Sequence, residues 1–203
     1  MSVDIDKIDW EKIGGMVPAI VQDALSMRVL MLGYCDRAAL EKTLETGLAT
    51  FYSRTKGRLW QKGETSGNVL RIRDIRMDCD NDALLMSVEP SGATCHLGTS
   101  SCFGDKKDSG LNVIADLVSV IRKRRAEMNA GSYTAKLFSE GMSRMAQKVG
   151  EEGVEVAIAA ATDADELPSE AADLIYHLLV LLEASRFDVM EVMKVLKDRS
   201  GGR

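Results

Sequence analysis

The first hundred residues alternate between short apolar runs and polar turns, which is the pattern of a mostly β domain. Apolar runs at 17–24 and 29–34 are close enough to predict a hairpin. Asp36 is a good helix N-cap, and Gly47 can end the short helix that follows it. The alternation changes phase near residue 73, which indicates a β-bulge. Further strands are predicted, in chain order, at 50–53, 58–61, 68–77 and 83–88.

From residue 111 the apolar spacing changes from two to between three and four, which predicts helices. A basic run at 122–125 suits the last turns of the first of them. The polar, glycine-flanked stretch 104–110 between the two patterns is the predicted domain boundary. The expected fold class is α+β, with a mostly β domain over 1–108 and an all-α helical bundle over 109–203. The other helices are predicted at 134–140, 142–161, 167–184 and 189–199.

Composition and charge argue against two classes of protein. The chain has 203 residues, of which 45% are apolar, and a net charge of −5. It is large enough to bury a core and lacks the basic footprint of a nucleic-acid binder. No stretch reaches the roughly 18 uninterrupted apolar residues of a membrane span, and the N-terminus is polar and acidic, unlike a signal peptide. We therefore expect no nucleic-acid partner, no membrane association and a cytoplasmic location.

Three aspartates alternate with other residues at 78–82. In an extended segment, side chains alternate between two faces, so Asp78, Asp80 and Asp82 would point one way and Cys79 the other. Oxygen ligands on one face suit a hard cation, and sulfur on the other suits a soft one. The segment is therefore a candidate for metal binding.

Cys79, Cys95 and Cys102 together can supply three thiolates. Clustered cysteines without a secretory signal favour metal binding over disulfides. Three protein ligands leave a fourth position on zinc for water, which is typical of a catalytic site. His96, next to Cys95, is then the candidate for carrying a proton; alternatively it is a fourth ligand of a structural zinc site. Cys35 lies in an apolar run and is expected to be a small buried residue.

The motifs Asp-Cys-Asp-Asn-Asp at 78–82 and Cys-His-Leu-Gly-Thr-Ser-Ser-Cys-Phe at 95–103, with the segment 51–68, resemble the phosphoribosyl-AMP cyclohydrolase family. The resemblance implies one zinc per subunit, held by the three cysteines across a homodimer interface, and magnesium held by the three aspartates. It also implies that zinc-bound hydroxide attacks C6 of the adenine ring of phosphoribosyl-AMP and opens the N1–C6 bond. Candidates for contacts with substrate phosphates, each of which also fits a solvated strand face, are Arg54, Lys56, Arg58 and Lys62.

A second acidic pattern lies on two of the predicted helices. The residues are Glu151, Glu152 and Glu155 on one helix and Glu170 and Asp173 on the next, with His177 one turn later. Like charges at spacings of three and four destabilise a helix unless a cation lies between them. Two helices that offer Glu-Glu-x-x-Glu and Glu-x-x-Asp can hold Mg²⁺ and, through it, a phosphate chain. The alternative is a solvated face with intrahelical pairs such as Lys148–Glu152.

The sequences at 132–137, 147–152 and 170–179 resemble the phosphoribosyl-ATP pyrophosphohydrolase family, which is all-α and related to MazG-type nucleotide pyrophosphatases. The resemblance implies that the five acidic residues bind magnesium or orient the attacking water, with Glu152 and Glu155 as the catalytic candidates. Lys136 and Lys148 become candidates for phosphate contacts.

The two resemblances span nearly the whole chain and match a bifunctional enzyme of histidine biosynthesis. The expected reactions are hydrolysis of phosphoribosyl-ATP to phosphoribosyl-AMP and pyrophosphate by the C-terminal domain, and ring opening of phosphoribosyl-AMP by the N-terminal domain. Two alternatives stay open. One is a structural zinc module fused to a regulatory helical bundle, and the other is a housecleaning nucleotide pyrophosphatase fused to a deaminase-like domain.

Overall fold

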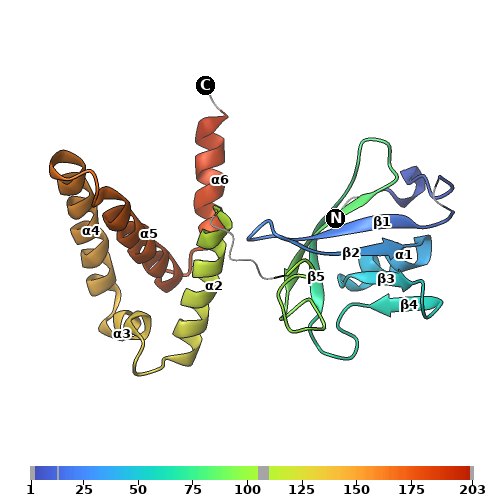
Figure 1. Ribbon diagram of the computed structural model, residues 1–203, viewed down its shortest axis with the longest axis horizontal. Helices are drawn as coiled ribbons and strands as arrows, with labels where there is room; N and C mark the ends of the chain where they lie inside the picture. Colours follow the sequence, from blue (N-terminus) through green and yellow to red (C-terminus); the bar gives the residue numbers. More distant parts are fainter. Residues whose placement is uncertain (1–2, 13, 105–109, 202–203) are drawn as a thin grey trace. The chain divides into compact units, whose positions relative to one another are not determined.

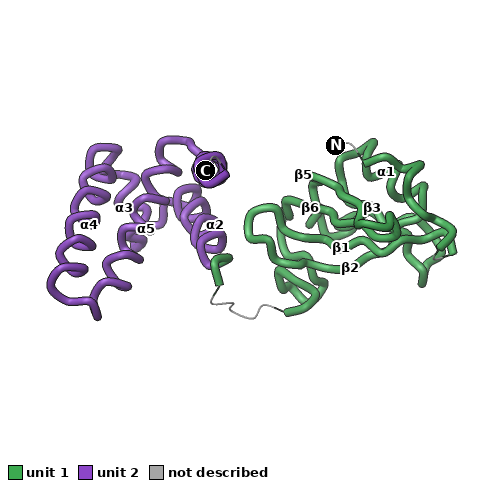
Figure 2. The backbone as a smooth tube through the Cα atoms, turned by 90° about the horizontal axis from the view of Figure 1, so that it is seen from above, with its two compact units in different colours: residues 1–112 green, residues 113–203 purple. Residues whose placement is uncertain are grey.

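Strands fill the first part of the chain and helices the second (Figure 1). The computed structural model describes residues 3–12, 14–104 and 110–201. The chain divides into two units, residues 1–112 and 113–203 (Figure 2). The arrangement confirms the predicted α+β class, with a mostly β part before an all-α part. The predicted boundary between residues 108 and 109 lies outside the described residues.

A four-stranded sheet in the order β2-β1-β6-β5 is the centre of the first unit. β1 pairs with β2 as the predicted antiparallel hairpin, and β1 runs parallel to β6. The register of β5 against β6 shifts between Ile72 and Asp74, which confirms the predicted bulge. β3 and β4 form a separate two-stranded sheet. The bounds are η1 Ile5–Lys7, β1 Val17–Asp23, β2 Val29–Cys35, α1 Arg37–Thr46, β3 Thr50–Ser53, β4 Arg58–Gln61, β5 Leu70–Met77 and β6 Leu84–Pro90.

The core of this unit follows from alternation along the strands. On β1 and β6, every second residue is buried, in the sets Val17, Ala19, Val21 and Leu84, Met86, Val88. Helix α1 begins at the predicted N-cap Asp36, whose side chain accepts a hydrogen bond from the Ala39 N–H. It ends at Gly47, where φ is +69°. Cys35 is fully buried as expected, and burial raises the pKa of its thiol to about 12.

The second unit consists of helices whose long pair, α4 and α5, lies side by side (Figures 1 and 2). The predicted helices are confirmed with small shifts at their ends. Among the described residues, no helix combines the length and the apolar character that crossing a membrane requires. The bounds are α2 Asn112–Glu127, α3 Tyr133–Glu140, α4 Met142–Thr162, α5 Leu167–Ala184 and α6 Val189–Ser200.

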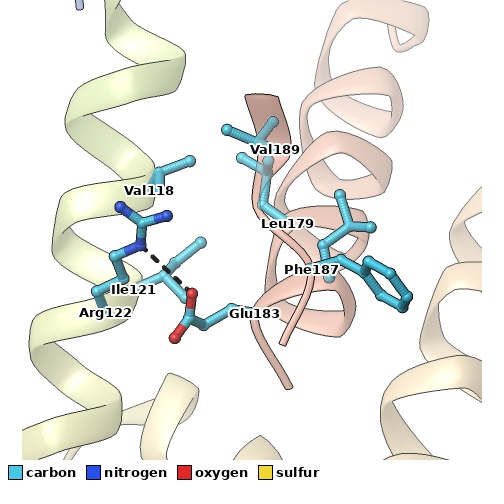
Figure 3. A pocket seen from close by; sticks show the side chains of 8 residues that line it. Val118, Ile121, Arg122, Leu179, Glu183, Phe187 and Val189 are labelled. Atoms are coloured by element: carbon cyan, nitrogen blue, oxygen red, sulfur yellow. Dashed lines mark hydrogen bonds and ion pairs between the residues drawn. The ribbon is translucent and has the colours of Figure 1, made fainter. Parts of the chain in front are cut away.

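A small pocket lies between α2, the end of α5 and the start of α6 (Figure 3). Its lining is apolar apart from Arg122 and Glu183, whose Nε and Oε2 atoms are 3.4 Å apart. Arg125 donates a second hydrogen bond to Glu183, at 2.9 Å. None of the predicted metal ligands lines the pocket. We therefore interpret it as a packing junction between three helices.

The close packing of Gly33 against Phe51 in the β unit can be tested by mutation. A Cβ added there would lie 2.4 Å from Cδ1 of Phe51, a ring that is 1% exposed. We predict that Gly33→Ala lowers the free energy of unfolding by about 1–3 kcal/mol, as overpacking of cores does. Chemical denaturation of the full chain measures it. In a Phe51→Leu background, Gly33→Ala should lower the free energy of unfolding clearly less. An equal loss in both backgrounds would contradict a clash between the added Cβ and the Phe51 ring.

Candidate metal centres

The turn between β5 and β6 brings Asp78, Asp80 and Asp82 together. One carboxylate oxygen from each lies within 4.8 Å of the others. The expectation of an extended segment was wrong, because the chain turns after β5 and Asn81 adopts a left-handed conformation with φ of +61°. Oδ1 of Asp78 accepts hydrogen bonds from the backbone N–H groups of Asp82 and Ala83, at 3.0 and 3.1 Å. The turn itself therefore fixes one member of the triad.

Lys12 supplies a positive charge to this triad. Its Nζ lies 2.5 Å from Oδ2 of Asp80 and 2.6 Å from Oδ2 of Asp82. The hydrogen bond from Lys12 lowers the pKa of Asp80, and the two aspartates raise the pKa of Lys12. No signal in the sequence linked Lys12 to the aspartates, since they are far apart along the chain.

Cys95 and Cys102 face each other across the loop that follows β6. The loop is closed by a hydrogen bond from the Cys95 N–H to the Thr99 carbonyl, at 3.0 Å. The backbone N–H of Leu97 lowers the pKa of the Cys95 thiol, followed by the Thr99 hydroxyl. Burial, then the neighbouring Cys95, raises the pKa of Cys102. The pair is chemically suited to a soft cation, which would remove the repulsion between two thiolates.

Cys79 lies in the aspartate turn, away from the other two thiols. It is exposed, and its Sγ is 3.9 Å from Oδ1 of Asp80. Among the described residues, no group of three ligand atoms within 4.8 Å includes a cysteine. A single chain therefore brings two of the three predicted zinc ligands together and leaves the third apart.

Strand β6 lies between the aspartate turn, which contains Cys79, and the loop that contains Cys95 and Cys102. Cys79 precedes it and Cys95 follows it, and seven residues of strand span on the order of 20 Å. The loop with Cys102 is anchored to β2, because the Cys102 N–H donates to the Leu30 carbonyl at 2.7 Å. Leu30 lies next to Val29, which pairs with Gln22, and Gln22 pairs with Ser87, the middle residue of β6.

The other predicted residues of this unit differ in their surroundings. His96 is exposed, with Nδ1 3.9 Å from Sγ of Cys95. Arg58 is already paired with Glu64 at 2.6 Å, and the guanidinium of Arg54 lies 3.8 Å from the centre of the Tyr34 ring. Lys56 is exposed. Lys62 is the exception, since it is 8% exposed and its charge lowers the pKa of Cys102.

In the helical unit, Glu152 and Glu155 of α4 converge with Glu170 of α5. One carboxylate oxygen from each lies within 4.8 Å of the others. Two further predicted ligands lie outside this group. Glu151 turns to Lys148, Arg144 and Gln147, at 3.0, 3.4 and 2.7 Å, and Asp173 is exposed on α5. Lys136 is exposed and lies 3.8 Å from Glu140.

The electrostatics of this group centre on Glu152, which is 5% exposed. The Nζ of Lys148 lies 2.6 Å from its Oε1 and lowers the pKa of Glu152. Glu152 in turn raises the pKa of Glu155. The intrahelical pair between Lys148 and Glu152 that the alternative expected is present. Glu152 is buried, however, so a solvated face does not describe this residue. The donor set is all oxygen, as Mg²⁺ requires.

His177 completes the surroundings of Glu152, although no role was predicted for it. Its Nε2 lies 3.6 Å from Oε1 of Glu152, and burial lowers its pKa. The rings of Tyr133 and Tyr176 meet the imidazole edge-on, with centroids 5.9 and 5.1 Å away. Its position one turn after Asp173 on the same helix was the available signal.

Known proteins match both halves of the chain, in the same order as the two centres. The profile of the phosphoribosyl-AMP cyclohydrolase family matches residues 31–104, and that of the phosphoribosyl-ATP pyrophosphohydrolase family matches residues 114–200. The histidine biosynthesis bifunctional protein HisIE of Escherichia coli (strain K12) is 54% identical over 194 residues, which cover 95% of each chain. The chain belongs to the HisIE family.

Other HisIE proteins support the same assignment. That of Photobacterium profundum is 51% identical over 201 residues, covering 96% of this chain and 97% of the relative. That of Vibrio parahaemolyticus is 53% identical over 197 residues, covering 96% and 93%. Both resemblances predicted from the motifs are thus confirmed, and each HisIE half contains one acidic triad.

Proposed function

We propose that the chain catalyses two consecutive hydrolyses of histidine biosynthesis. Water first splits phosphoribosyl-ATP into phosphoribosyl-AMP and pyrophosphate in the helical unit. A second water then adds at C6 of the adenine ring in the β unit, and the N1–C6 bond breaks. The observation that carries the proposal is that both hydrolase families match one chain, each over the unit that contains an acidic triad. A cytoplasmic location is part of the proposal.

In the helical unit, Glu152, Glu155 and Glu170 are the proposed ligands of Mg²⁺. A bound magnesium ion would neutralise the phosphate charge of the substrate. Glu155 is the exposed member of the triad, so we assign to it the contact with the attacking water. Lys148 bridges Glu151 and Glu152, which holds α4's acidic residues in place and leaves an ammonium beside the phosphate chain. Lys136 and Asp173 are proposed to contact the substrate from the exposed surface.

In the β unit, Cys79, Cys95 and Cys102 are the proposed zinc ligands, and Asp78, Asp80 and Asp82 the proposed magnesium ligands. Zinc held by three thiolates would lower the pKa of water to about 7 and supply hydroxide at neutral pH. The residues present fit such an ion, because Cys95 and Cys102 face each other and the backbone favours the Cys95 thiolate. His96 is the proposed proton carrier. Lys62, which is buried near Cys102, is the basic residue we place nearest the reacting ring.

We also propose that the zinc site is shared by two chains of a homodimer. Within one chain β6 lies between Cys79 and the other two thiols, and Cys79 is exposed. A second chain can bring its own Cys95 and Cys102 to Cys79 without disturbing the strand. The proposed domain limits, 1–108 and 109–203, would then leave each unit with its own chemistry.

The test of the function supplies phosphoribosyl-ATP and follows pyrophosphate release and ring opening separately. The wild-type chain should carry out both, and free ATP should not be hydrolysed at a comparable rate. Cys79→Ser, Cys95→Ser and Cys102→Ser should each lose bound zinc and stop at phosphoribosyl-AMP, with pyrophosphate release retained. Cys35→Ser, at a buried thiol, is the matched control and should keep both steps.

Two results would contradict this assignment. Ring opening by Cys95→Ser protein with a full zinc content would remove the thiols from the site. Hydrolysis of free nucleotides in preference to phosphoribosyl-ATP would favour the housecleaning pyrophosphatase instead.

The shared site predicts complementation between two inactive variants. Chains with Cys79→Ser and chains with Cys95→Ser, unfolded and refolded together, form mixed dimers with one intact and one doubly damaged site. Ring opening should return in the mixture and stay absent in either variant alone. If mixed dimers form and no activity returns, each site is built within one chain.

Substitutions of the acidic residues on α4 and α5 should reduce pyrophosphate release to different degrees. Glu155→Gln and Glu170→Gln each remove a charge from the converging group while keeping size and hydrogen-bonding capacity, so pyrophosphate release should fall by at least ~100-fold. Asp173→Asn, outside the group of three, should cost less. Ring opening of supplied phosphoribosyl-AMP is the internal control and should be unchanged in all three. Near-normal pyrophosphate release at saturating Mg²⁺ in the two glutamate variants would rule out the magnesium site.

A further inference from the structure

His177 is a buried polar residue on an otherwise apolar stretch of α5. It is 5% exposed, and its Nδ1 has no hydrogen-bond partner within the described ranges. The residues that follow it, 178–180, are leucine, leucine and valine. Buried polar atoms in folded proteins are normally paired, so an unpaired one requires an explanation.

We assign the tautomer of His177 from the nitrogen that lies nearest to Glu152. Nε2 is 3.6 Å from Oε1 of Glu152, and because a carboxylate oxygen only accepts hydrogen bonds, the tautomer suited to this place carries its proton on Nε2. The other nitrogen, Nδ1, is then an unpaired acceptor, which costs free energy in a buried place. A leucine at this position would avoid that cost. Stability alone therefore does not account for the histidine.

Two groups meet the same oxygen of Glu152. Lys148 lies 2.6 Å from Oε1, and Nε2 of His177 lies 3.6 Å from the same atom. Lys148 is bonded to Oε1 and His177 lies close to the same atom, so Oε2 is left for a different contact. Glu155 and Glu170 converge on that carboxylate from α4 and α5.

We propose that His177 is a positioning residue that holds Oε1 of Glu152, so that Oε2 faces a divalent cation bound among Glu152, Glu155 and Glu170. The present 3.6 Å separation is longer than a hydrogen bond. It closes when the cation draws the three carboxylates together, as contacts in unliganded sites commonly do. This inference rests on the proposed function, because it needs a cation at that place.

The imidazole is held in the orientation that this role requires. Tyr133 and Tyr176 stack on each other, and both rings lie roughly perpendicular to the imidazole. Tyr176 is itself fixed, because its hydroxyl lies 2.8 Å from Oγ1 of Thr134, a fully buried residue. Arg124 of α2 donates to the same Oγ1 at 3.1 Å. A chain of contacts through α2, α3 and α5 thus fixes the ring beside Glu152.

The test compares three replacements of His177 in the full chain. Glutamine can place its amide N–H near the position of Nε2, asparagine places it near Nδ1, and leucine removes it. The probe is Mn²⁺ alone, titrated without substrate. Protein with both Glu155→Gln and Glu170→Gln defines the binding that remains at the aspartate triad. Thermal unfolding and the kcat and KM for pyrophosphate release are measured alongside.

We expect His177→Leu and His177→Asn to weaken Mn²⁺ binding by about 10-fold, the lower end of what residues that orient metal ligands contribute. His177→Gln should stay within about threefold of wild type. The kcat should fall in the same order with KM for phosphoribosyl-ATP little changed. His177→Leu should melt no lower than wild type. Leu179→Ala, at a buried residue that lines the small pocket beside α2, is the control and should lower the melting temperature without changing Mn²⁺ affinity.

Two outcomes would overturn the proposal. One is unchanged Mn²⁺ affinity in His177→Leu, and the other is an equal loss in all three replacements, which would mark a packing role. The result also separates this inference from the function on which it rests. If Mn²⁺ affinity follows the expected order but even the wild type releases no pyrophosphate, the positioning role stands and the proposed reaction fails. If the wild type releases pyrophosphate and His177→Leu leaves the Mn²⁺ affinity unchanged, the proposed reaction stands and the positioning role fails.

Discussion

Both candidate centres depend on holding carboxylates closer together than their mutual repulsion favours. In each unit, three oxygen atoms from three acidic residues lie within 4.8 Å of one another. In each, one lysine ammonium partly balances them: Lys12 contacts Asp80 and Asp82, and Lys148 contacts Glu151 and Glu152. The balance is incomplete, because Glu152 still raises the pKa of Glu155. A group of anions with one tethered cation is a place where a divalent ion stabilises the fold that holds it.

The two units meet this constraint by different means. In the β unit the triad is local, since all three aspartates belong to one turn and backbone N–H groups hold Asp78. In the helical unit the triad exists only while α4 packs against α5, because Glu170 comes from a different helix. The first centre therefore depends on turn geometry and the second on tertiary packing. A substitution that loosens the helix pair would disperse the second triad and leave the first intact.

Hydrophobic periodicity was enough to predict most of the architecture. The strands at 50–53 and 58–61 and the helix at 167–184 were predicted to the residue, because caps, glycines and alternation agree there. The turn at 78–82 was not, since β5 ends at Met77 and Asn81 adopts a left-handed conformation within the turn, and alternation carries no signal for either. Which glutamates converge was also undecided by spacing alone, as Glu151 and Glu152 are both one turn from Glu155.

The rotation of α4 decides between Glu151 and Glu152, and the sequence contained a signal for it. The buried residues of this helix are Met145, Glu152 and Ala159, each seven residues from the next. Two helical turns separate such positions, so they share one stripe. A glutamate on the stripe between a methionine and an alanine is forced inward, while Glu151 falls beside it and meets the side chains of Lys148 and Arg144. Lys12 and the contact between His177 and Glu152 had no comparable signal, because both depend on how distant segments pack.

Strand β6 gives the same kind of argument for the thiols. It pairs with β1 on one side and with β5 on the other, and it separates Cys79 from Cys95 and Cys102. Joining the three thiols within one chain would require the segments before and after β6 to move toward each other. Cys79 and Cys102 are both exposed, and Cys95 is buried beside Cys102. The proposed site, completed by a second copy, requires no such movement, so the pairs on both sides of β6 stay intact.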